Sequence, residues 1–469
     1  MKFIVPEKYY FRIHHIRPRF KNDVESVLLY IADAINQIGI ADTKKFNEKL
    51  IGAIYSYPGN AHKKIKTINN WRTEISSLFG LIEFDESNAY PSRLTKKLAS
   101  NEDLIQFFRY FLSSFCYPGG HLKPQEIKKI IQEKVKFHPA KSLIELAIFA
   151  TKKSNGERFG ISKSEATHHL FNDLRVTRGT ADSKKIYENI IFSRDCKHEY
   201  NSSGDVVRYA GDILDYLVLA DLFDQKLDGK YYPKMQNLNA MKAILESESF
   251  YGIYDHLYEQ KELNISEISE LKNVWLKKIN EDITDNKFDT DIDSLLNYEE
   301  IKESADVSIL KNLATEITSK AVTTKKIGDY GEAITIEHEK NRIKRLGRED
   351  LIHKILKLPE NLAMGFDIKS FLGENEEFSN IHIEVKTTIS KNKLRVHSFT
   401  LTKNEFDVAQ SYRESYYIYR LLISSSEFKL FVIKDPIGKY KQDKVKLSVS
   451  DGARITYTDE SGDWHKVLI

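Results

Sequence analysis

Hydrophobic and polar residues follow two different periods in the two parts of this 469-residue chain. Before about residue 281 the apolar positions recur mainly at helical spacing, which predicts a largely helical N-terminal half. After about residue 305 several segments alternate at every second residue, which is typical of strands with one buried face. The pattern predicts a multidomain α+β protein, with a mainly helical half followed by an α/β domain built on a central mixed sheet.

Two segments of the helical half repeat one theme. Residues 75–98 and residues 210–233 each combine an amphipathic helix with two short strands and a polar turn between the strands. Asp228-Gly229 in the second segment is a strong turn signal. A helix followed by a hairpin, with two further helices before it, is typical of a winged helix-turn-helix module, and we expect two such modules.

Net charge says little about partners, because 71 Lys and Arg against 68 Asp and Glu give +3, but the charge is unevenly distributed. Residues 281–303 hold nine acids and two lysines. This segment predicts a linker, although a solvated loop within one domain is an open alternative. We expect winged-helix-like subdomains, an acidic linker and a C-terminal domain, with boundaries at 1–125, 126–280, 281–304 and 305–469.

Each expected module carries a polar, basic helix where a recognition helix could lie. Lysine and arginine neutralise phosphates, while asparagine and arginine can pair bidentately with base edges in the major groove. A basic helix face is often only solvated, so each helix alone leaves both interpretations open. The candidate DNA contacts, including two arginines of an N-terminal arm, are Arg17, Arg19, Lys63, Lys64, Lys66, Asn69, Asn70, Arg72, Arg175, Arg178, Lys184 and Lys185.

The most specific constellation lies in the C-terminal domain. Within residues 381–388 the alternating pattern predicts a strand from which Glu384 and Lys386 project on the same face. Within GFDIKSF the same alternation places Phe366 and Ile368 inward and Asp367 on the opposite side. Two adjacent strands would therefore bring Asp367, Glu384 and Lys386 together.

A helix is predicted over GDYGEAITIEHEKNRI, with Glu332 in its first turn, from which that side chain could reach the cluster. Downstream, Thr402 and Glu405 form a capping box that starts a helix ending at Tyr412. Two apolar strands follow. The predicted order of elements is α-β-β-β-α-β-β.

Carboxylates beside a lysine suit the hydrolysis of a phosphodiester by bound Mg²⁺. A small, hard cation prefers oxygen ligands and keeps several waters, so Asp367 and Glu384 could hold it beside the scissile phosphate. The metal would activate a water and offset charge in the transition state. Lys386 would orient or deprotonate that water or stabilise the transition state.

Glu332, Gly365-Phe-Asp367 and Glu384-Val-Lys386 together resemble the signature of the PD-(D/E)XK nuclease superfamily, in the branch of archaeal Holliday-junction resolvases. The resemblance covers about residues 325–436, and Phe366 replaces the proline that names the motif. It implies that Asp367 and Glu384 are metal ligands, that Glu332 is an additional ligand, and that Lys386 is the catalytic lysine.

The whole architecture resembles type II restriction endonucleases of the BpuJI kind, which have separate recognition and cleavage domains. This resemblance implies a IIS-like, Mg²⁺-dependent enzyme that reads an asymmetric site in double-stranded DNA and cuts to one side. It further implies an at least transient homodimer and a cognate DNA methyltransferase. Two alternatives stay open: a nuclease subunit of another defence or recombination system, and a non-catalytic winged-helix DNA-binding regulator.

Other classes of protein are disfavoured. No apolar run approaches the roughly 18 to 20 residues that span a bilayer, so we expect no membrane association and, by default, a cytoplasmic location. Cys116 and Cys196 are too few and too far apart for a disulfide framework or a zinc ribbon. The sequence predicts neither the recognition site nor the cut offset, because base readout depends on side-chain geometry in the groove.

Overall fold

The computed structural model describes residues 2–15, 24–154, 158–248, 250, 252–281, 283–284, 287–288, 290, 326–359, 364–372, 379–391, 394, 397–424, 428–450 and 452–468. Arg17, Arg19 and most of the expected linker at 281–304 lie outside these residues. Among the helices that the structure describes, none combines the length and apolar character that a membrane crossing requires.

The first hairpin is confirmed, and a short third strand joins it. β1 pairs with β3 and β3 pairs with β2, so the sheet order is β1-β3-β2. The basic segment and the amphipathic helix expected before the hairpin are one helix, α3, because Ile68, Trp71 and Ile75 form a continuous buried face. The elements are α1 (Val24–Ile38), β1 (Ala41–Asp42), α2 (Thr43–Ser56), α3 (Ile65–Leu78), β2 (Ile82–Phe84) and β3 (Asn88–Pro91).

The second hairpin is also confirmed, with the same pairing order. Ile161 exchanges two backbone hydrogen bonds with Tyr231 of β5, and β5 pairs with β4. The helix before this hairpin is α11, while the basic segment lies further upstream on α9 and α10. The elements are α7 (Pro139–Lys153), α8 (Lys163–Ala166), a π-helical turn (Thr167–Phe171), α9 (Leu174–Thr177), α10 (Ser183–Asp195), α11 (Gly204–Leu219), β4 (Phe223–Gln225) and β5 (Tyr231–Pro233).

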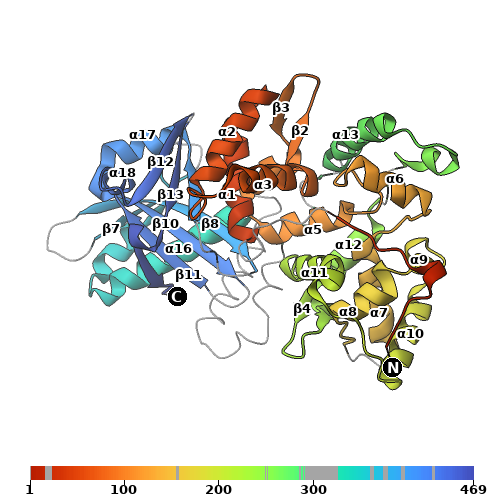
Figure 1. Cartoon of the computed structure of the whole chain (residues 1–469). Coiled ribbons are helices and arrows are strands. Elements are labelled where there is room, and N and C mark those ends of the chain that lie inside the picture. Colours follow the sequence, from red (N-terminus) through yellow and green to blue (C-terminus); the bar gives the residue numbers. More distant parts are fainter. Residues whose placement is uncertain are drawn as a thin grey trace.

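Helix α5 joins the two hairpin-bearing parts into one core (Figure 1). Phe111 of α5 packs against Phe79, which directly follows α3, and against Tyr216 of α11. Aromatic side chains therefore connect elements far apart in the sequence. The other helices of this half are α4 (Arg93–Asn101), α5 (Leu104–Ser114), α6 (Pro124–Gln132), α12 (Leu238–Glu246) and α13 (Ile265–Glu281), with short 3₁₀ turns at Glu7–Tyr9, Met235–Asn237 and Asp255–Glu259.

The C-terminal half contains the predicted central mixed sheet, of order β14-β11-β10-β8-β7-β6, in which β8 and β10 are parallel and the other pairs antiparallel. A second sheet has the order β12-β13-β9. The elements are α16 (Lys326–Arg345), a 3₁₀ turn (Glu349–Lys354), β6 (Leu356–Lys357), β7 (Ile368–Phe371), β8 (Asn380–Ser390), β9 (His397–Leu401), α17 (Lys403–Tyr412), β10 (Tyr416–Ser424), β11 (Phe428–Lys434), α18 (Pro436–Lys441), β12 (Val445–Ser450), β13 (Gly452–Tyr457) and β14 (Asp463–Lys466), with 3₁₀ turns at Arg413–Ser415 and Asp459–Ser461.

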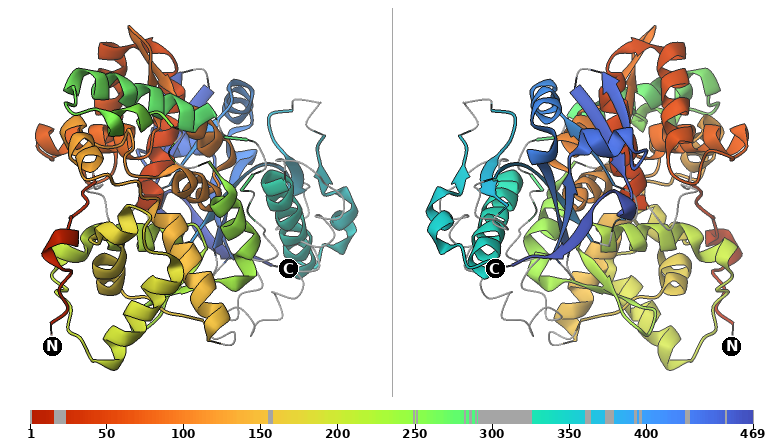
Figure 2. Two further views of the ribbon diagram at one scale, coloured as in Figure 1. Left: turned by 90° about the vertical axis from the view of Figure 1, so that its right-hand side faces the viewer. Right: turned by 90° about the vertical axis from the view of Figure 1, so that its left-hand side faces the viewer.

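Two layers cover the large sheet (Figures 1 and 2). Helix α16 packs Tyr330 and Ile334 with Ile383 and its neighbours on one face, whereas α17 and the small sheet cover the other. The expectation that Phe366 and Ile368 share a face is wrong, since they belong to different core clusters. The reason is that β7 begins only at Ile368, so strand alternation does not extend back to Phe366.

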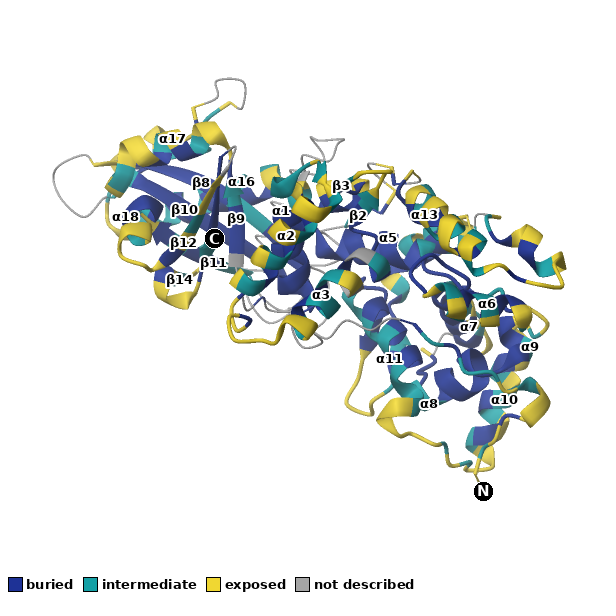
Figure 3. Cartoon of the chain, turned by 45° about the horizontal axis from the view of Figure 1, so that its top comes forward, coloured by how far each residue is buried: buried dark blue, intermediate teal, exposed yellow. Residues whose placement is uncertain are grey.

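The end of β8 touches the N-terminal half. The Ile389 N–H donates a hydrogen bond to the Glu102 carbonyl at 3.2 Å, directly before α5. The buried Arg420 of β10 forms an ion pair with the Glu102 side chain, and Lys391 lies 3.0 Å from Asp221. Figure 3 shows α5 and the central strands as largely buried. The strand that carries Glu384 and Lys386 is therefore fixed at its far end by the other half of the molecule.

Candidate active site

Asp367, Glu384 and Lys386 lie together, as the sequence predicts. Strand pairing sets Ile368 of β7 opposite Ile383 of β8, and the Asp367 N–H donates to the Ile383 carbonyl at 2.9 Å. The Val385 N–H in turn donates to Asp367 Oδ2 at 2.8 Å. The Asp367 carboxylate is thus held beside β8 by the backbone.

Glu384 and Lys386 occupy the same face of β8, two residues apart. Lys386 Nζ lies 2.6 Å from Glu384 Oε1 and 3.1 Å from Glu405 Oε2, at the start of α17. Glu405 also completes the predicted capping box with Thr402, which the structure confirms. One lysine therefore bridges two carboxylates from two different elements.

The site gathers three carboxylates, of which Glu384 is buried and Asp367 and Glu405 are partly buried. Burial raises the pKa of Glu384 well above its usual range, and the neighbouring Asp367 and Glu405 carboxylates raise it further, against the opposing effect of Lys386. Burial likewise raises the pKa of Asp367, although the Val385 N–H opposes this. For Lys386, burial lowers the pKa but Glu384 and Glu405 more than offset it, so the net shift is upward. A nearby cation would stabilise the charged form of carboxylates in such a site.

Glu332 borders the Asp367 side of the cluster. Its nearest partner is Lys357 of β6, at 2.8 Å, and Lys357 also contacts Asp329. Burial raises the pKa of Glu332, and the Asp367 carboxylate contributes to the shift. Gly331 permits the close approach of α16, because a Cβ at that position would collide with Thr387 of β8.

The residues fit a small, hard divalent cation by the chemistry of their donors. Glu384 is a buried carboxylate and Asp367 a partly buried one, and the two are in electrostatic contact. Oxygen ligands of this type suit Mg²⁺, which usually takes one or two carboxylates and completes its shell with water and phosphate oxygens. Within the described ranges, no three Asp, Glu, His or Cys side chains form a complete metal cluster. Asp367 and Glu384 would therefore supply the one or two carboxylates that Mg²⁺ usually takes from a protein.

Glu405 and Lys357 belong to the site, but no sequence motif identifies them as site residues. Glu405 is visible in the sequence only as part of the capping box, a role that explains its presence without any chemistry. Lys357 lies on a two-residue strand with no alternating pattern. The position of Glu405, in the first turn of the helix after the strand that follows Lys386, is the signal that could have located it.

The first set of candidate DNA contacts lies on and just before α3. Ile68 and Trp71 are buried, whereas Lys63, Lys64 and Lys66 are exposed and Asn69, Asn70 and Arg72 are partly exposed. Lys63 also lies over the Trp71 ring, 5.0 Å from its centroid. The structure thus gathers these six side chains in one region that includes the polar side of a single helix.

In the second set of candidate DNA contacts, the two arginines form local ion pairs. Arg175 is paired with Asp173, and Arg178 with Glu133 at 3.1 Å. Lys184 and Lys185, in the first turn of α10, are exposed. These residues do not lie on the helix that leads into the second hairpin, which is α11.

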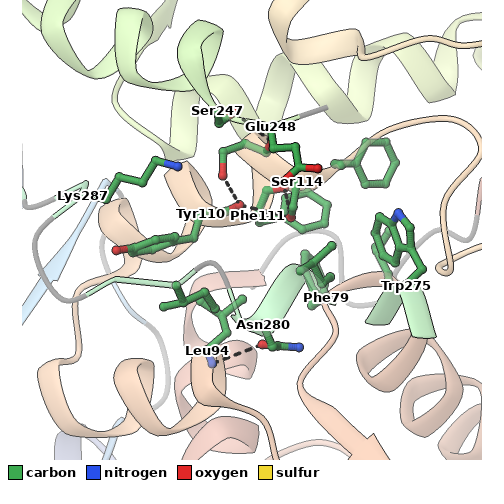
Figure 4. A pocket seen from close by; sticks show the side chains of 15 residues that line it. Phe79, Leu94, Tyr110, Phe111, Ser114, Ser247, Glu248, Trp275, Asn280 and Lys287 are labelled. Atoms are coloured by element: carbon green, nitrogen blue, oxygen red, sulfur yellow. Dashed lines mark hydrogen bonds between the residues drawn. The ribbon is translucent and has the colours of Figure 1, made fainter. Parts of the chain in front are cut away.

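A small cavity of about 20 Å³ lies in the N-terminal half between α3, α5 and α13 (Figure 4). Phe79, Tyr110 and Trp275 line it, and Asn280 accepts a hydrogen bond from the Leu94 N–H across it. None of the residues of the carboxylate cluster lines this cavity, so it is separate from the candidate active site.

Comparisons with known proteins match both halves. Residues 3–276 match the family described as restriction endonuclease BpuJI, N terminal, and residues 331–433 match the family described as protein NO VEIN, C-terminal. The second match includes Glu332, Asp367, Glu384, Lys386 and Glu405. No curated protein matches the chain.

The solved structures with a similar fold include a complex with DNA. It is a crystal structure of pyrene- and phenanthrene-modified DNA in complex with the BpuJ1 endonuclease binding domain, with 20% sequence identity and a TM-score of 0.52. The similarity covers 58% of this chain and 98% of that chain.

The helical half, with its two hairpins on a shared core, is of the restriction-endonuclease DNA-binding class. The match over residues 3–276 spans more than half of the chain. The chain therefore belongs to the family of the BpuJI restriction endonuclease N-terminal domain.

Proposed function

We propose that the protein is a Mg²⁺-dependent, sequence-specific double-strand DNA endonuclease of type II, with IIS-like separation of recognition and cleavage. The proposal rests on one observation: Asp367, Glu384 and Lys386 converge within a mixed-sheet domain attached to a restriction-endonuclease recognition half. This arrangement supports a C-terminal nuclease domain of the PD-(D/E)XK type.

The residues of the site divide the chemistry between them. Asp367 and Glu384 would hold Mg²⁺, with Glu332 as an additional ligand, and the metal would supply an activated water and a counter-charge for the scissile phosphate. The Val385 N–H orients Asp367. Lys386 would place its ammonium beside the phosphate, where negative charge increases in the transition state.

For recognition, we propose that the order helix, strand, two helices and hairpin forms a winged helix in the first module, with α3 as its recognition helix. The polar side of α3 carries Lys66, Asn69, Asn70 and Arg72, which suits phosphate and base-edge contacts in the major groove. The similarity of this half to the BpuJ1 endonuclease binding domain, which was solved in complex with DNA, supports this assignment.

One site of this type cuts one strand. Cleavage of both strands therefore requires a second copy, at least transiently, or two successive nicks. A restriction role further requires a cognate DNA methyltransferase that protects the host DNA.

A second candidate function is a nuclease subunit of another defence or recombination system. The C-terminal match favours it specifically, because residues 331–433 resemble a family that is not described as a restriction enzyme. A methyltransferase gene beside the gene for this protein would favour restriction instead.

The test is incubation of the purified full chain with plasmid and phage DNA, in Mg²⁺ or in EDTA, resolved on a gel. We expect discrete Mg²⁺-dependent fragments whose sequenced ends give the site and the offset. Glu384→Ala and Lys386→Ala should each abolish cleavage while specific binding in a mobility-shift assay is retained. Cleavage by Glu384→Ala at the wild-type rate would refute the metal site.

A further inference from the structure

Lys386 has two carboxylate partners that differ in burial and in anchoring. Glu384, at 2.6 Å, is almost fully buried on the same strand, with its side chain 4% exposed, whereas Glu405, at 3.1 Å, lies on α17 and is 18% exposed. Since a short ion pair with Glu384 would already suffice to pair Lys386, the second carboxylate calls for an explanation.

Glu405 is anchored independently of the lysine. Its Oε2 accepts a hydrogen bond from the Thr402 N–H at 3.0 Å, and its own N–H donates to Thr402 Oγ1 at 3.3 Å. This capping box fixes the carboxylate at the start of α17, whichever partner Lys386 has. Glu405 is therefore a fixed anion, about a hydrogen-bond length from the ammonium.

Glu384 cannot bind a divalent cation and the Lys386 ammonium equally well at the same time. A carboxylate oxygen that coordinates a divalent cation gives up most of its attraction for a neighbouring ammonium, because the two positive charges repel each other across it. Lys386 then needs another anion to remain in place. Among the described residues, Glu405 is the carboxylate that contacts both Lys386 and a separate backbone anchor.

We infer that Glu405 is a positioning residue, which holds Lys386 in the site when Glu384 coordinates a divalent cation. The inference rests on the proposed function. Because Glu405 holds Lys386, Glu384 can bind the metal while Lys386, two residues further along β8, stays in place.

The chain offers variants that separate charge from helix capping. Glu405→Gln removes the charge but keeps an acceptor that can complete the capping box. Thr402→Ala removes the cap hydroxyl but keeps the Glu405 charge, and is the matched control. Lys386→Ala removes the group that Glu405 is inferred to hold.

The first readout is the affinity of the full chain for Mn²⁺ or Ca²⁺ by titration calorimetry, which requires no cleavage. Glu405→Gln leaves Lys386 to compete for Glu384, so affinity should fall about five-fold, the size of a partly exposed ion pair. In the Lys386→Ala background the same substitution should have no effect. An equal loss in both backgrounds would mean that Glu405 acts directly on the cation, and an unchanged affinity in the first background would likewise overturn the inference.

The second readout is cleavage kinetics. Glu405→Gln should lower kcat about 10- to 100-fold with the KM for DNA unchanged, since misplacing a catalytic group affects the transition state rather than substrate binding. Thr402→Ala should melt at a lower temperature yet keep its kcat. If Glu384→Ala still cuts, the proposed function fails; if Glu384→Ala is inactive while Glu405→Gln has the wild-type kcat, only the role of Glu405 fails.

Discussion

At the scale of single residues, Gly331 decides how closely α16 approaches the sheet. A Cβ there would collide with the Thr387 hydroxyl of β8, on the strand that carries the candidate lysine. We predict that Gly331→Ala destabilises the protein by about 1 to 3 kcal/mol, the usual cost of an overpacked site, and lowers the melting temperature.

Gly328, on the same helix, provides the control. It is exposed, and a Cβ there would meet no atom within 4 Å. Gly328→Ala should raise the melting temperature slightly, because alanine favours a helix over glycine by about 0.5 to 1 kcal/mol. Equal shifts for the two variants would show that the approach to Thr387 does not matter.

The residues of the site differ in how far the sequence predicts them. Glu384 and Lys386 follow from a strand period of two, which local sequence determines. The closeness of Asp367 was predicted for a partly wrong reason, since Phe366 and Ile368 do not share a face. The sequence places Glu405 in the first turn of α17, but its 3.1 Å contact with Lys386 depends on how α17 folds back over β8, which no local pattern determines.

At the scale of elements, α3 is the part of the proposed winged helix that should contact DNA. Arg72→Ala and Lys66→Ala should each weaken binding and reduce the slope of log K against log salt by about one, if each side chain neutralises one phosphate. Titrations by fluorescence anisotropy at several salt concentrations measure this slope. The exposed Lys152→Ala on α7, which removes the same charge elsewhere, should leave the slope unchanged.

The two hairpins show what element-level patterns predict. Turn residues and short apolar runs located both hairpins, since these signals are local. The same patterns predict, in each module, a basic helix upstream of an amphipathic helix: in the first module both are α3, whereas in the second the basic segment lies on α9 and α10 and the amphipathic helix is α11. The buried apolar stripe of α11, with Ile213, Leu214 and Leu217, packs against the shared core, and only tertiary packing distinguishes it from a recognition helix.

At the scale of the whole molecule, β8 and β10 connect the candidate active site to the recognition half. Arg420 is almost fully buried and pairs with Glu102, just before α5. Glu102→Gln leaves that guanidinium without a carboxylate, so we predict a loss of about 3 kcal/mol in the free energy of unfolding. No local pattern predicts this contact, because the two residues are 318 positions apart.

Thermal and urea denaturation measure this loss. Glu188→Gln, which removes the partner of Lys185 in an exposed pair with 3.9 Å between charged atoms, should cost less than about 1 kcal/mol. Adding Arg420→Met to Glu102→Gln should recover part of the stability, since the uncompensated buried charge is gone. Similar losses for Glu102→Gln and Glu188→Gln would contradict the prediction.

The contact between α1 and β13 should make stability depend on pH. Burial raises the pKa of Asp33 to about 6, although Arg454, at 3.8 Å, opposes the shift. An unfolded aspartate titrates near about 3.9, so the folded protein binds this proton more tightly. The resulting stabilisation is fully present below about pH 4 and is lost as the pH rises through about 6.

Relative to Asp33→Asn, the wild type should therefore lose up to about 3 kcal/mol between pH 4 and pH 6. Melting curves of both proteins across this range test the sign, with the exposed Asp463→Asn as control for the loss of one carboxylate. Parallel curves for the wild type and Asp33→Asn would rule out a role for Asp33.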